Sequence, residues 1–274
     1  MKIHLLSIDP QNDFVLPDGN LTVPGAEDDM KRLASFVDDN IKRIDDIHVT
    51  LDSHLPLHIA HPQMWIDAEG NHPYPFTLIN RDEVRDGKWR TVVPLMYDDP
   101  DDGRMTWGEY YTKKLADNGR YVLCIWPPHC LIGTPGHNIY GALSDVLIKW
   151  QLERTGLVHY VTKGSNFKTE HYSAVEADVV IPNDDTTQLN MDLITMLQDA
   201  EISDILISGE ALSHCVKNTV EDIANNFGEE NIKKFVLLED TCSNVPSFEV
   251  LGEEFVTNMT ARGMRVSTTT DYFA

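Results

Sequence analysis

Five residues that could carry out covalent or metal chemistry stand where apolar, strand-like runs of the chain end. KIHLLSID ends at Asp9, DIHVTLD at Asp52 and LVHYVTK at Lys163. YVLCIW is followed by Pro-Pro-His129, and DILISG by a short turn and Cys215. In an open parallel α/β sheet, ligands bind at the carboxyl ends of the strands. Side chains that are far apart in the sequence can therefore converge on one cleft.

Cys215 has the sequence context of a nucleophile. A strand that ends in Gly209 is followed by Glu-Ala-Leu-Ser-His and then by a helical pattern, so Ser213 is a candidate N-cap and Cys215 lies in the first helical turn. Free backbone N–H groups and the positive end of the helix dipole favour a thiolate there. The same elbow directs amide donors at a developing oxyanion. A structural cysteine that packs the helix start is the alternative.

Asp9 and Lys163 have the charges that a thiol nucleophile needs. A carboxylate beside the thiol could take its proton, pass it to a leaving amine and later activate water. A lysine in the same cleft would balance the carboxylate and favour thiolate. Either residue could instead be an ordinary turn or solvent-exposed charge. Asp13, in the same IDPQNDF stretch, is better suited to binding loop backbone.

Asp52 and His54 form the first half of a candidate metal site. Residues at i and i+2 lie on the same side of an extended strand end, so the two side chains can share a cation. His129, on a stiff Pro-Pro loop, is the preferred third ligand, and His58 and His61 remain alternatives. One carboxylate and two imidazoles suit zinc or another borderline divalent metal. Ordinary surface histidines are the competing interpretation.

Strand-like runs alternate with helical patterns, which is typical of a doubly wound α/β sheet. The short strands are apolar throughout, as expected when both faces of a parallel sheet are buried. Later strands are expected at Phe235–Leu238 and Met264–Thr268. Helical spacing predicts helices at Ala26–Ile44, His137–Arg154, Leu189–Ala200, His214–Phe227 and Ser247–Arg262.

The segment from Leu55 to Arg120 breaks this rhythm. It is rich in Pro, Asp-Gly, Trp and Tyr, and Met105–Asn118 is its one candidate helix of useful length. We expect an insertion over the carboxyl edge of the sheet, within a single domain that spans residues 1–274. A solvated surface excursion is an equal alternative.

Composition excludes two classes of partner. The 274 residues carry a formal net charge of −22, which repels nucleic-acid backbones and anionic membranes. No stretch approaches the about 20 apolar residues that span a bilayer. The N-terminal apolar run is too short for a signal peptide, and the four cysteines include no C-x-x-C pair. A reducing, cytoplasmic location is expected.

The chain resembles the nicotinamidase branch of the isochorismatase-like cysteine hydrolases. The matching motifs occur in the family's order over almost the whole chain: IDPQNDF, LDSHLPLH, WPPHCLIGTPGH, VTKGSN, HYSA and GEALSHCVKNTVED. The resemblance implies a three-layer α/β/α fold with a central, mostly parallel sheet. It also implies an amide hydrolase that converts nicotinamide to nicotinate and ammonia through a thioester, in the salvage of NAD.

The resemblance also assigns roles to individual positions. It implies a catalytic triad of Asp9, Lys163 and Cys215, and an oxyanion hole formed by the amides of Ala211 and Cys215, with a cis peptide at Glu210–Ala211. It further implies a metal site formed by Asp52, His54 and His129, with zinc as the first candidate and iron or manganese as alternatives. The residues that it implies around the substrate ring are Phe14, Trp126 and Tyr172.

Two rival functions follow from the same motifs. A related cysteine hydrolase could act on another small amide, such as pyrazinamide, a maleamate, or a ureido or carbamoyl compound. A catalytically silent zinc-binding interaction protein could retain the fold without the reaction. We expect a small-molecule carboxamide as the partner and a homo-oligomer as the assembly.

Overall fold

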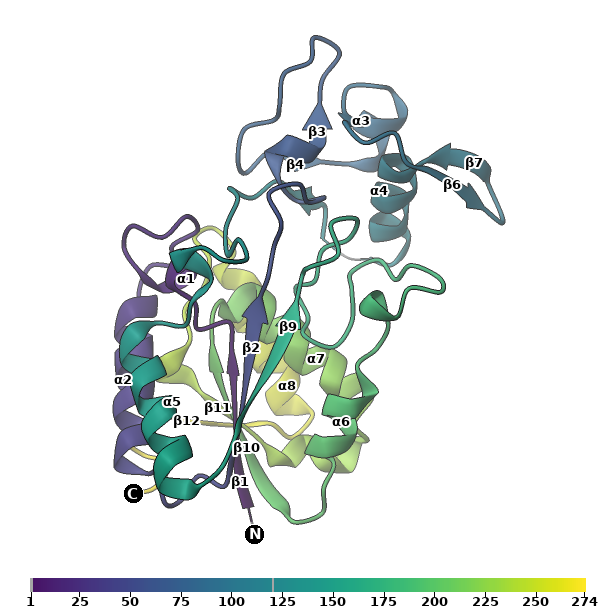
Figure 1. The fold of residues 1–274 in the computed structure, drawn as a ribbon. Coiled ribbons are helices and arrows are strands. Elements are labelled where there is room, and N and C mark those ends of the chain that lie inside the picture. The colour runs from purple at the N-terminus through teal and green to yellow at the C-terminus, as the bar shows by residue number, and fades with distance from the viewer. Residues whose placement is uncertain (1, 120) are drawn as a thin grey trace.

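Six parallel strands form the centre of the molecule in a computed structural model that describes residues 2–119 and 121–274. Their order across the sheet is β12-β11-β10-β1-β2-β9, so the first strand lies near the middle (Figure 1). The bounds are β1 Lys2–Ile8, β2 Asp46–Asp52, β9 Val158–Lys163, β10 Ile202–Gly209, β11 Phe235–Leu238 and β12 Arg265–Ser267.

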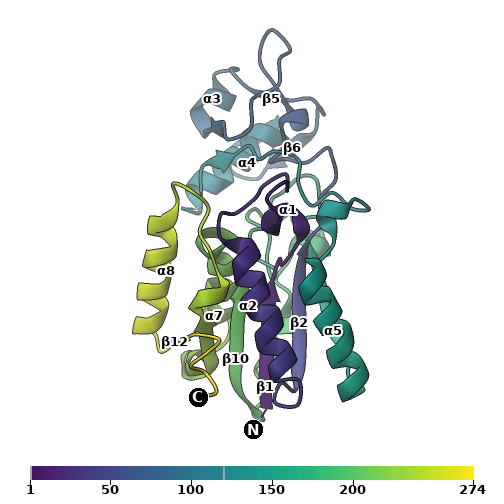
Figure 2. The same cartoon turned by 90° about the vertical axis from the view of Figure 1, so that its left-hand side faces the viewer.

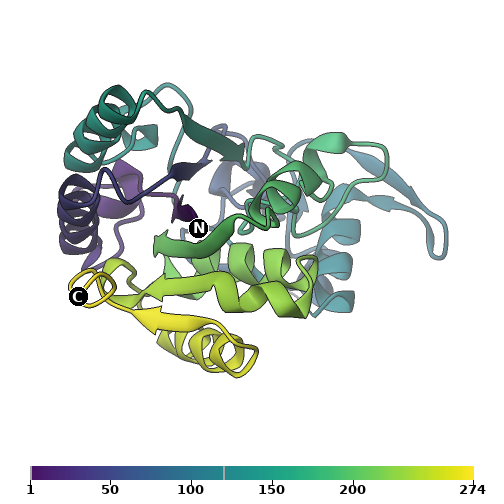
Figure 3. The same cartoon turned by 90° about the horizontal axis from the view of Figure 1, so that it is seen from below.

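Helices cover both faces of this sheet, which confirms the predicted three-layer α/β/α fold. On one face lie α2 (Ala26–Asp39) and α5 (Gly141–Arg154), and on the other lie α6 (Met191–Leu197), α7 (Lys217–Asn225) and α8 (Glu249–Ala261), as Figure 3 shows end on. Successive strand residues point to opposite faces. Leu5 accordingly packs with the α2 and α5 side chains and Leu6 with those of α7 and α8, both fully buried.

The predicted helices are present but shorter than their sequence patterns suggested. The helix expected over Ala26–Ile44 ends at Asp39, where the side-chain amide of Asn40 donates to the carbonyl of Phe36. Short helices complete the elements: α1 (Asn12–Val15), η2 (Pro135–His137), η3 (Asp185–Thr187), η5 (Glu229–Lys234) and η6 (Glu239–Thr241). None of the described helices has the length and apolar character needed to cross a lipid bilayer.

Strand register brings the ends of neighbouring strands to one level. Asp52 at the end of β2 lies opposite Lys163 at the end of β9. Ile8, which precedes Asp9, lies between Thr50 of β2 and Gly209 of β10. Three of the chemically capable runs therefore end side by side at the same edge of the sheet.

The prediction that YVLCIW is a strand of this sheet is wrong. Only Leu123–Cys124 (β8) is a strand, and it pairs antiparallel with Leu78–Ile79 (β4) outside the central sheet. The next backbone N–H groups donate to Thr77 and Ala60. A short apolar run indicates that its residues are buried, but it does not identify the segment that buries them. Here that segment is the one that follows β2.

That segment lies above the carboxyl edge of the sheet (Figures 1 and 2). Two fully buried aromatic side chains, Trp65 and Tyr111, pack within it, and Trp107 Nε1 donates to the carbonyl of Lys168 at 2.7 Å. Arg120, the last residue of the predicted 55–120 insertion, lies outside the described residues. The elements are η1 (Pro62–Met64), β3 (Trp65–Ile66), β4, α3 (Arg81–Arg85), β5 (Arg90–Thr91), β6 (Met96–Asp99), β7 (Gly103–Thr106) and α4 (Trp107–Asp117).

A ladder of stacked histidines makes the sheet sensitive to acid. The rings of His4, His48 and His159, on adjacent strands β1, β2 and β9, stack with centroids 4.7 and 4.6 Å apart. Neither nitrogen of the buried His4 ring has a hydrogen-bond partner among the described residues. Burial, together with the neighbouring imidazoles, lowers the pKa of His4 to about 3.

We expect His4→Phe to reduce the loss of stability in acid. Because the folded pKa lies below the unfolded value of about 6.5, the unfolded chain binds the proton first, and stability falls as pH drops from about 6.5 towards 3. For His4 alone, the loss between pH 7 and pH 5 is about 2 kcal/mol. Urea unfolding of both proteins at the two pH values measures it. An equal loss in both would contradict this origin.

Candidate active site

The ammonium group of Lys163 contacts both predicted catalytic partners, Asp9 and Cys215, and the predicted metal ligand Asp52. Its Nζ lies 2.9 Å from Asp9 Oδ2, 3.1 Å from Asp52 Oδ1 and 3.6 Å from Cys215 Sγ, and it donates to the carbonyl of His171 at 2.8 Å. The side chain of Lys163 is only 2% exposed. The structure thus brings together the three residues expected to form a triad and connects them to the first expected metal ligand.

Asp9 is held rigidly at the end of β1. Its backbone adopts the left-handed conformation, with φ 48°, which a non-glycine residue rarely adopts. Thr50 of the neighbouring strand holds it at two points: its Oγ1 donates to Asp9 Oδ1 at 2.6 Å and accepts from the Asp9 N–H at 3.1 Å. Oδ2 faces Lys163. One carboxylate oxygen is thereby fixed and the other directed at the lysine and the thiol.

Cys215 lies in a short π-helix, η4 (Leu212–Val216), between β10 and α7. Ala211, rather than the predicted Ser213, is its N-cap residue. The Ser213 hydroxyl instead accepts from the N–H of Val245 and contacts Nδ1 of the following histidine, so it fastens the turn to a neighbouring loop. The Glu210–Ala211 peptide is cis, as the resemblance implied.

Burial shifts the pKa values of the three predicted catalytic groups. It raises the pKa of the Cys215 thiol well above its usual value, and the Lys163 ammonium offsets only part of that rise. Burial also raises the pKa of Asp9, against the pull of Lys163. The pKa of Lys163 would fall on burial, but Asp52 and Asp9 raise it well above its usual range. The thiol therefore lies beside an ammonium group and a carboxyl group that could exchange a proton with it.

The predicted metal ligands lie directly beside this group. Asp52 Oδ2 is 2.9 Å from His54 Nε2 and 3.3 Å from His129 Nε2. All three residues are buried, and His54 Nε2 has no hydrogen-bond partner among the described residues. Gly164, at φ +79°, leaves the space they need, since a Cβ there would lie 2.7 Å from both Asp52 Oδ1 and His54. The two alternative ligands, His58 and His61, are also buried near His54.

A cavity opens beside the thiol. Its walls are aromatic and apolar, and Trp126 Nε1 donates to the Tyr172 hydroxyl at 2.9 Å, which fixes two of the walls. The predicted residues that line it are Phe14, Asp52, Trp126, His129, Tyr172, Ala211 and Cys215. Lys163 contacts Cys215, and Asp9 contacts Lys163, so every predicted site residue belongs to one connected group.

Two titratable residues that line the cavity, His214 and Glu170, are not among the predicted site residues. The ring of His214 packs against both Trp126 and Tyr172, with centroids 5.5 and 5.3 Å away, and burial lowers its pKa to about 4, so it is neutral near pH 7. Glu170 lies 3.8 Å from His54 Nε2. Proximity to Cys215 in the sequence could have identified the first. The second precedes the HYSA motif, but nothing in that motif predicts its orientation.

No family model matches the chain, but it is similar in sequence and in fold to known proteins. The chain is 26% identical over 237 residues to the nicotinamidase of Saccharomyces cerevisiae, with 86% of each chain covered. The crystal structure of the yeast nicotinamidase Pnc1p bound to the inhibitor nicotinaldehyde shares the fold, with a TM-score of 0.63 at 22% identity over 97% of this chain and 99% of that one. The pyrazinamidase of Pyrococcus horikoshii in complex with zinc gives 0.56 at 18% identity over 98% and 99%. These similarities confirm the resemblance predicted from the motifs.

Proposed function

We propose, from the chain's resemblance to nicotinamidases in sequence and fold, that it is a metal-dependent cysteine amidohydrolase that converts nicotinamide to nicotinate and ammonia. The observation that carries the proposal is the contact of one buried ammonium, Lys163, with both the thiol and its carboxylate partner at the wall of an aromatic cavity. Aromatic walls suit a flat ring, because offset and edge-on ring contacts add to the gain from burial.

The covalent steps use residues of the chain alone. As the sulfur of Cys215 bonds to the carbonyl carbon, its proton passes to Asp9. Asp9 then protonates the amide nitrogen, the carbon–nitrogen bond breaks, and ammonia leaves the thioester. Asp9 next removes a proton from water, and the resulting attack releases nicotinate and restores the thiol. Proton-transfer roles of this kind contribute ~10²–10⁴-fold. Backbone N–H groups of Ala211 and Cys215 would stabilise the oxyanion, and losing one such donor costs ~10²–10³-fold.

Asp52, His54 and His129 would hold a divalent metal. A buried carboxylate beside two buried imidazoles, one with an unpartnered nitrogen, fits a borderline cation such as zinc, with iron and manganese as alternatives. The similar pyrazinamidase is in complex with zinc. When bound, the ion supplies a Lewis-acid anchor for the ring nitrogen of the substrate. The ring itself would pack against Phe14, Trp126 and Tyr172.

We extend the proposal to the whole chain. Residues 1–274 would form one isochorismatase-like domain in which 55–120 is an insertion that roofs the site. Four free, buried cysteines suit a reducing, cytoplasmic compartment. The partner would be a small carboxamide, without nucleic acid or membrane, and the assembly a homo-oligomer.

We expect removal of the metal to abolish productive binding of nicotinamide. Enzyme dialysed against a chelator should lose at least about 100-fold in ammonia release at low substrate, because the ring loses its anchor and three buried ligands lose their cation. Added zinc should restore the rate. Ammonia release from nicotinamide, pyrazinamide, a maleamate and a ureido compound, with and without metal, measures this. Equal rates in both preparations would refute the metal's role, and preference for another amide would reassign the substrate.

A further inference from the structure

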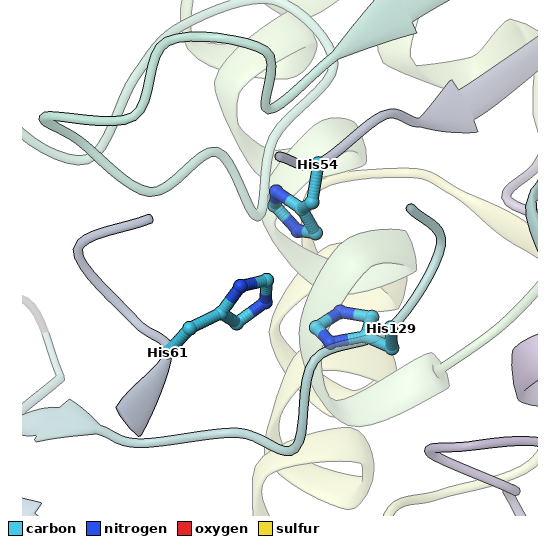
Figure 4. Close-up of side chains that lie close together, drawn as sticks. All are labelled: His54, His61 and His129. Carbon is cyan, nitrogen blue, oxygen red and sulfur yellow. The ribbon is translucent and has the colours of Figure 1, made fainter. Parts of the chain in front are cut away.

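Three histidines, not two, face the metal position. His54 and His61 lie in the segment that follows β2, His129 lies in the loop that follows β8, and the three rings point toward one another (Figure 4). One ring nitrogen of each lies within 4.8 Å of the other two. The ring centroids are 4.8 to 5.6 Å apart, with interplanar angles of 69 to 77°. Edge-on rings with converging nitrogens differ from the face-to-face stacking of the His4 ladder.

The far side of each ring is held by a backbone carbonyl. Nδ1 of His54 is 3.0 Å from the oxygen of Gly164, and Nδ1 of His129 is 2.8 Å from that of Pro127. Nδ1 of His61 is 3.4 Å from the oxygen of Pro56. Because a carbonyl only accepts, each Nδ1 carries the hydrogen and each Nε2 keeps its lone pair. Metal-binding histidines typically have this arrangement.

The Nε2 atom of His61 could bind a cation. It is buried and has no hydrogen-bond partner among residues 2–119 and 121–274, and the same holds for His54 Nε2. An imidazole nitrogen buried without a partner costs free energy, which a bound cation would recover. His61 is fully buried, so water does not reach this atom from the surface.

His58, the other candidate, has both nitrogens occupied. Its Nε2 is 3.2 Å from the carbonyl oxygen of Thr169, so Nε2 carries the hydrogen and donates it. Its Nδ1 accepts from the N–H of Ala60 at 3.3 Å. Metal coordination by His58 would require one of these bonds to break. The backbone therefore distinguishes two histidines that the sequence spacing alone does not.

We propose that His61 is a fourth protein ligand of the metal, beside Asp52, His54 and His129, and that His58 orients the loop that carries it. The proposal rests on the metal site of the proposed function and deepens it. A third imidazole favours zinc, iron, cobalt or nickel over magnesium or manganese. His61 directly precedes η1 and β3, so the ion would join the segment above the sheet to the strand ends below.

Metal affinity, rather than activity, tests this assignment. The variants are His61→Gln, which keeps a polar side chain, and His61→Phe, which keeps a ring, with His58→Gln as the matched control. Zinc affinity is measured by competition with a chelating dye, and the visible absorption of the cobalt-loaded proteins reports the ligand set. Circular dichroism shows whether each His61 variant folds. If one of the two does not fold, the assignment is tested with the other.

We expect both His61 variants to bind zinc more than about 100-fold more weakly, since even partners that contact a ligand contribute 10–100-fold. Their cobalt spectra should change, whereas His58→Gln should keep the wild-type spectrum and stay within about 10-fold in affinity. Wild-type affinity and spectrum in a folded His61 variant would overturn the assignment, as would a greater loss for His58→Gln. Ammonia release by the wild-type protein is measured separately. If the wild type released no ammonia but still bound metal through His61, the amidase proposal would be overturned and the ligand assignment would stand.

Discussion

Cys215→Ala is expected to lower ammonia release from nicotinamide by at least about 10⁴-fold, because no other cysteine among the described residues lines the cavity to form the thioester. Cys215 lines the cavity and is 7% exposed, so removal of the sulfur leaves a small void that opens toward the ligand space. We therefore expect the folded structure and metal content to persist. Initial rates measured by coupled ammonia detection, with thermal unfolding alongside, provide the measurement.

Cys242→Ala is the matched control for that variant. It removes an equally buried thiol, 8% exposed, that does not line the cavity, and it should retain wild-type turnover. A thiol-alkylating reagent should inactivate the wild type more slowly when nicotinamide is present. Appreciable ammonia release by Cys215→Ala, or equal losses in the two variants, would refute the covalent mechanism.

Asp9→Asn should lower kcat by ~10²–10⁴-fold with little effect on KM, because the amide cannot take the thiol proton. Burial raises the pKa of Asp9 above its usual value, and only the ionised carboxylate can act as the base. Activity of the wild type should therefore fall as pH drops through this raised pKa, and the variant should lack that acid limb. Rates measured for both proteins from pH 4 to pH 8 test whether the activity of the wild type alone falls in acid.

Asp13→Asn distinguishes catalysis from folding in the same loop. The Asp13 carboxylate accepts from the backbone N–H of Cys130 at 2.6 Å and of Asn20 at 3.0 Å, as predicted for a residue that binds loop backbone. Weakening these bonds should cost about 1–3 kcal/mol of stability while kcat changes little. If Asp13→Asn lost as much kcat as Asp9→Asn, the two roles assigned here would be wrong.

The sequence predicted the parts of the fold and site that depend on strand ends. Asp52 and Lys163 end β-strands and Asp9 directly follows one, and parallel strands place their carboxyl ends on one edge of the sheet. YVLCIW was assigned to the sheet because its apolar character does not identify the partner that buries it. Burial also raises the pKa of the Cys215 thiol, and it depends on tertiary packing that the local helix pattern does not predict.

The choice between His58 and His61 shows a second limit. Both follow β2 within a few residues, and both are fully buried. The two rings differ in the backbone carbonyl that each contacts. His58 contacts the carbonyl of Thr169, more than 100 positions along the chain, whereas His61 contacts that of nearby Pro56. Spacing within a motif cannot predict partners supplied by a distant segment.

The strand order has a consequence for synthesis on the ribosome. β1 precedes the other described strands in the chain, yet it pairs with β10, whose residues begin at Ile202, as well as with β2. At 5–20 residues per second, translation leaves one edge of that apolar strand without its neighbour for roughly 10 to 40 s. Unpaired edges invite aggregation, so the nascent chain depends on shielding, by a chaperone or by its own early helices, until the central pairing is complete.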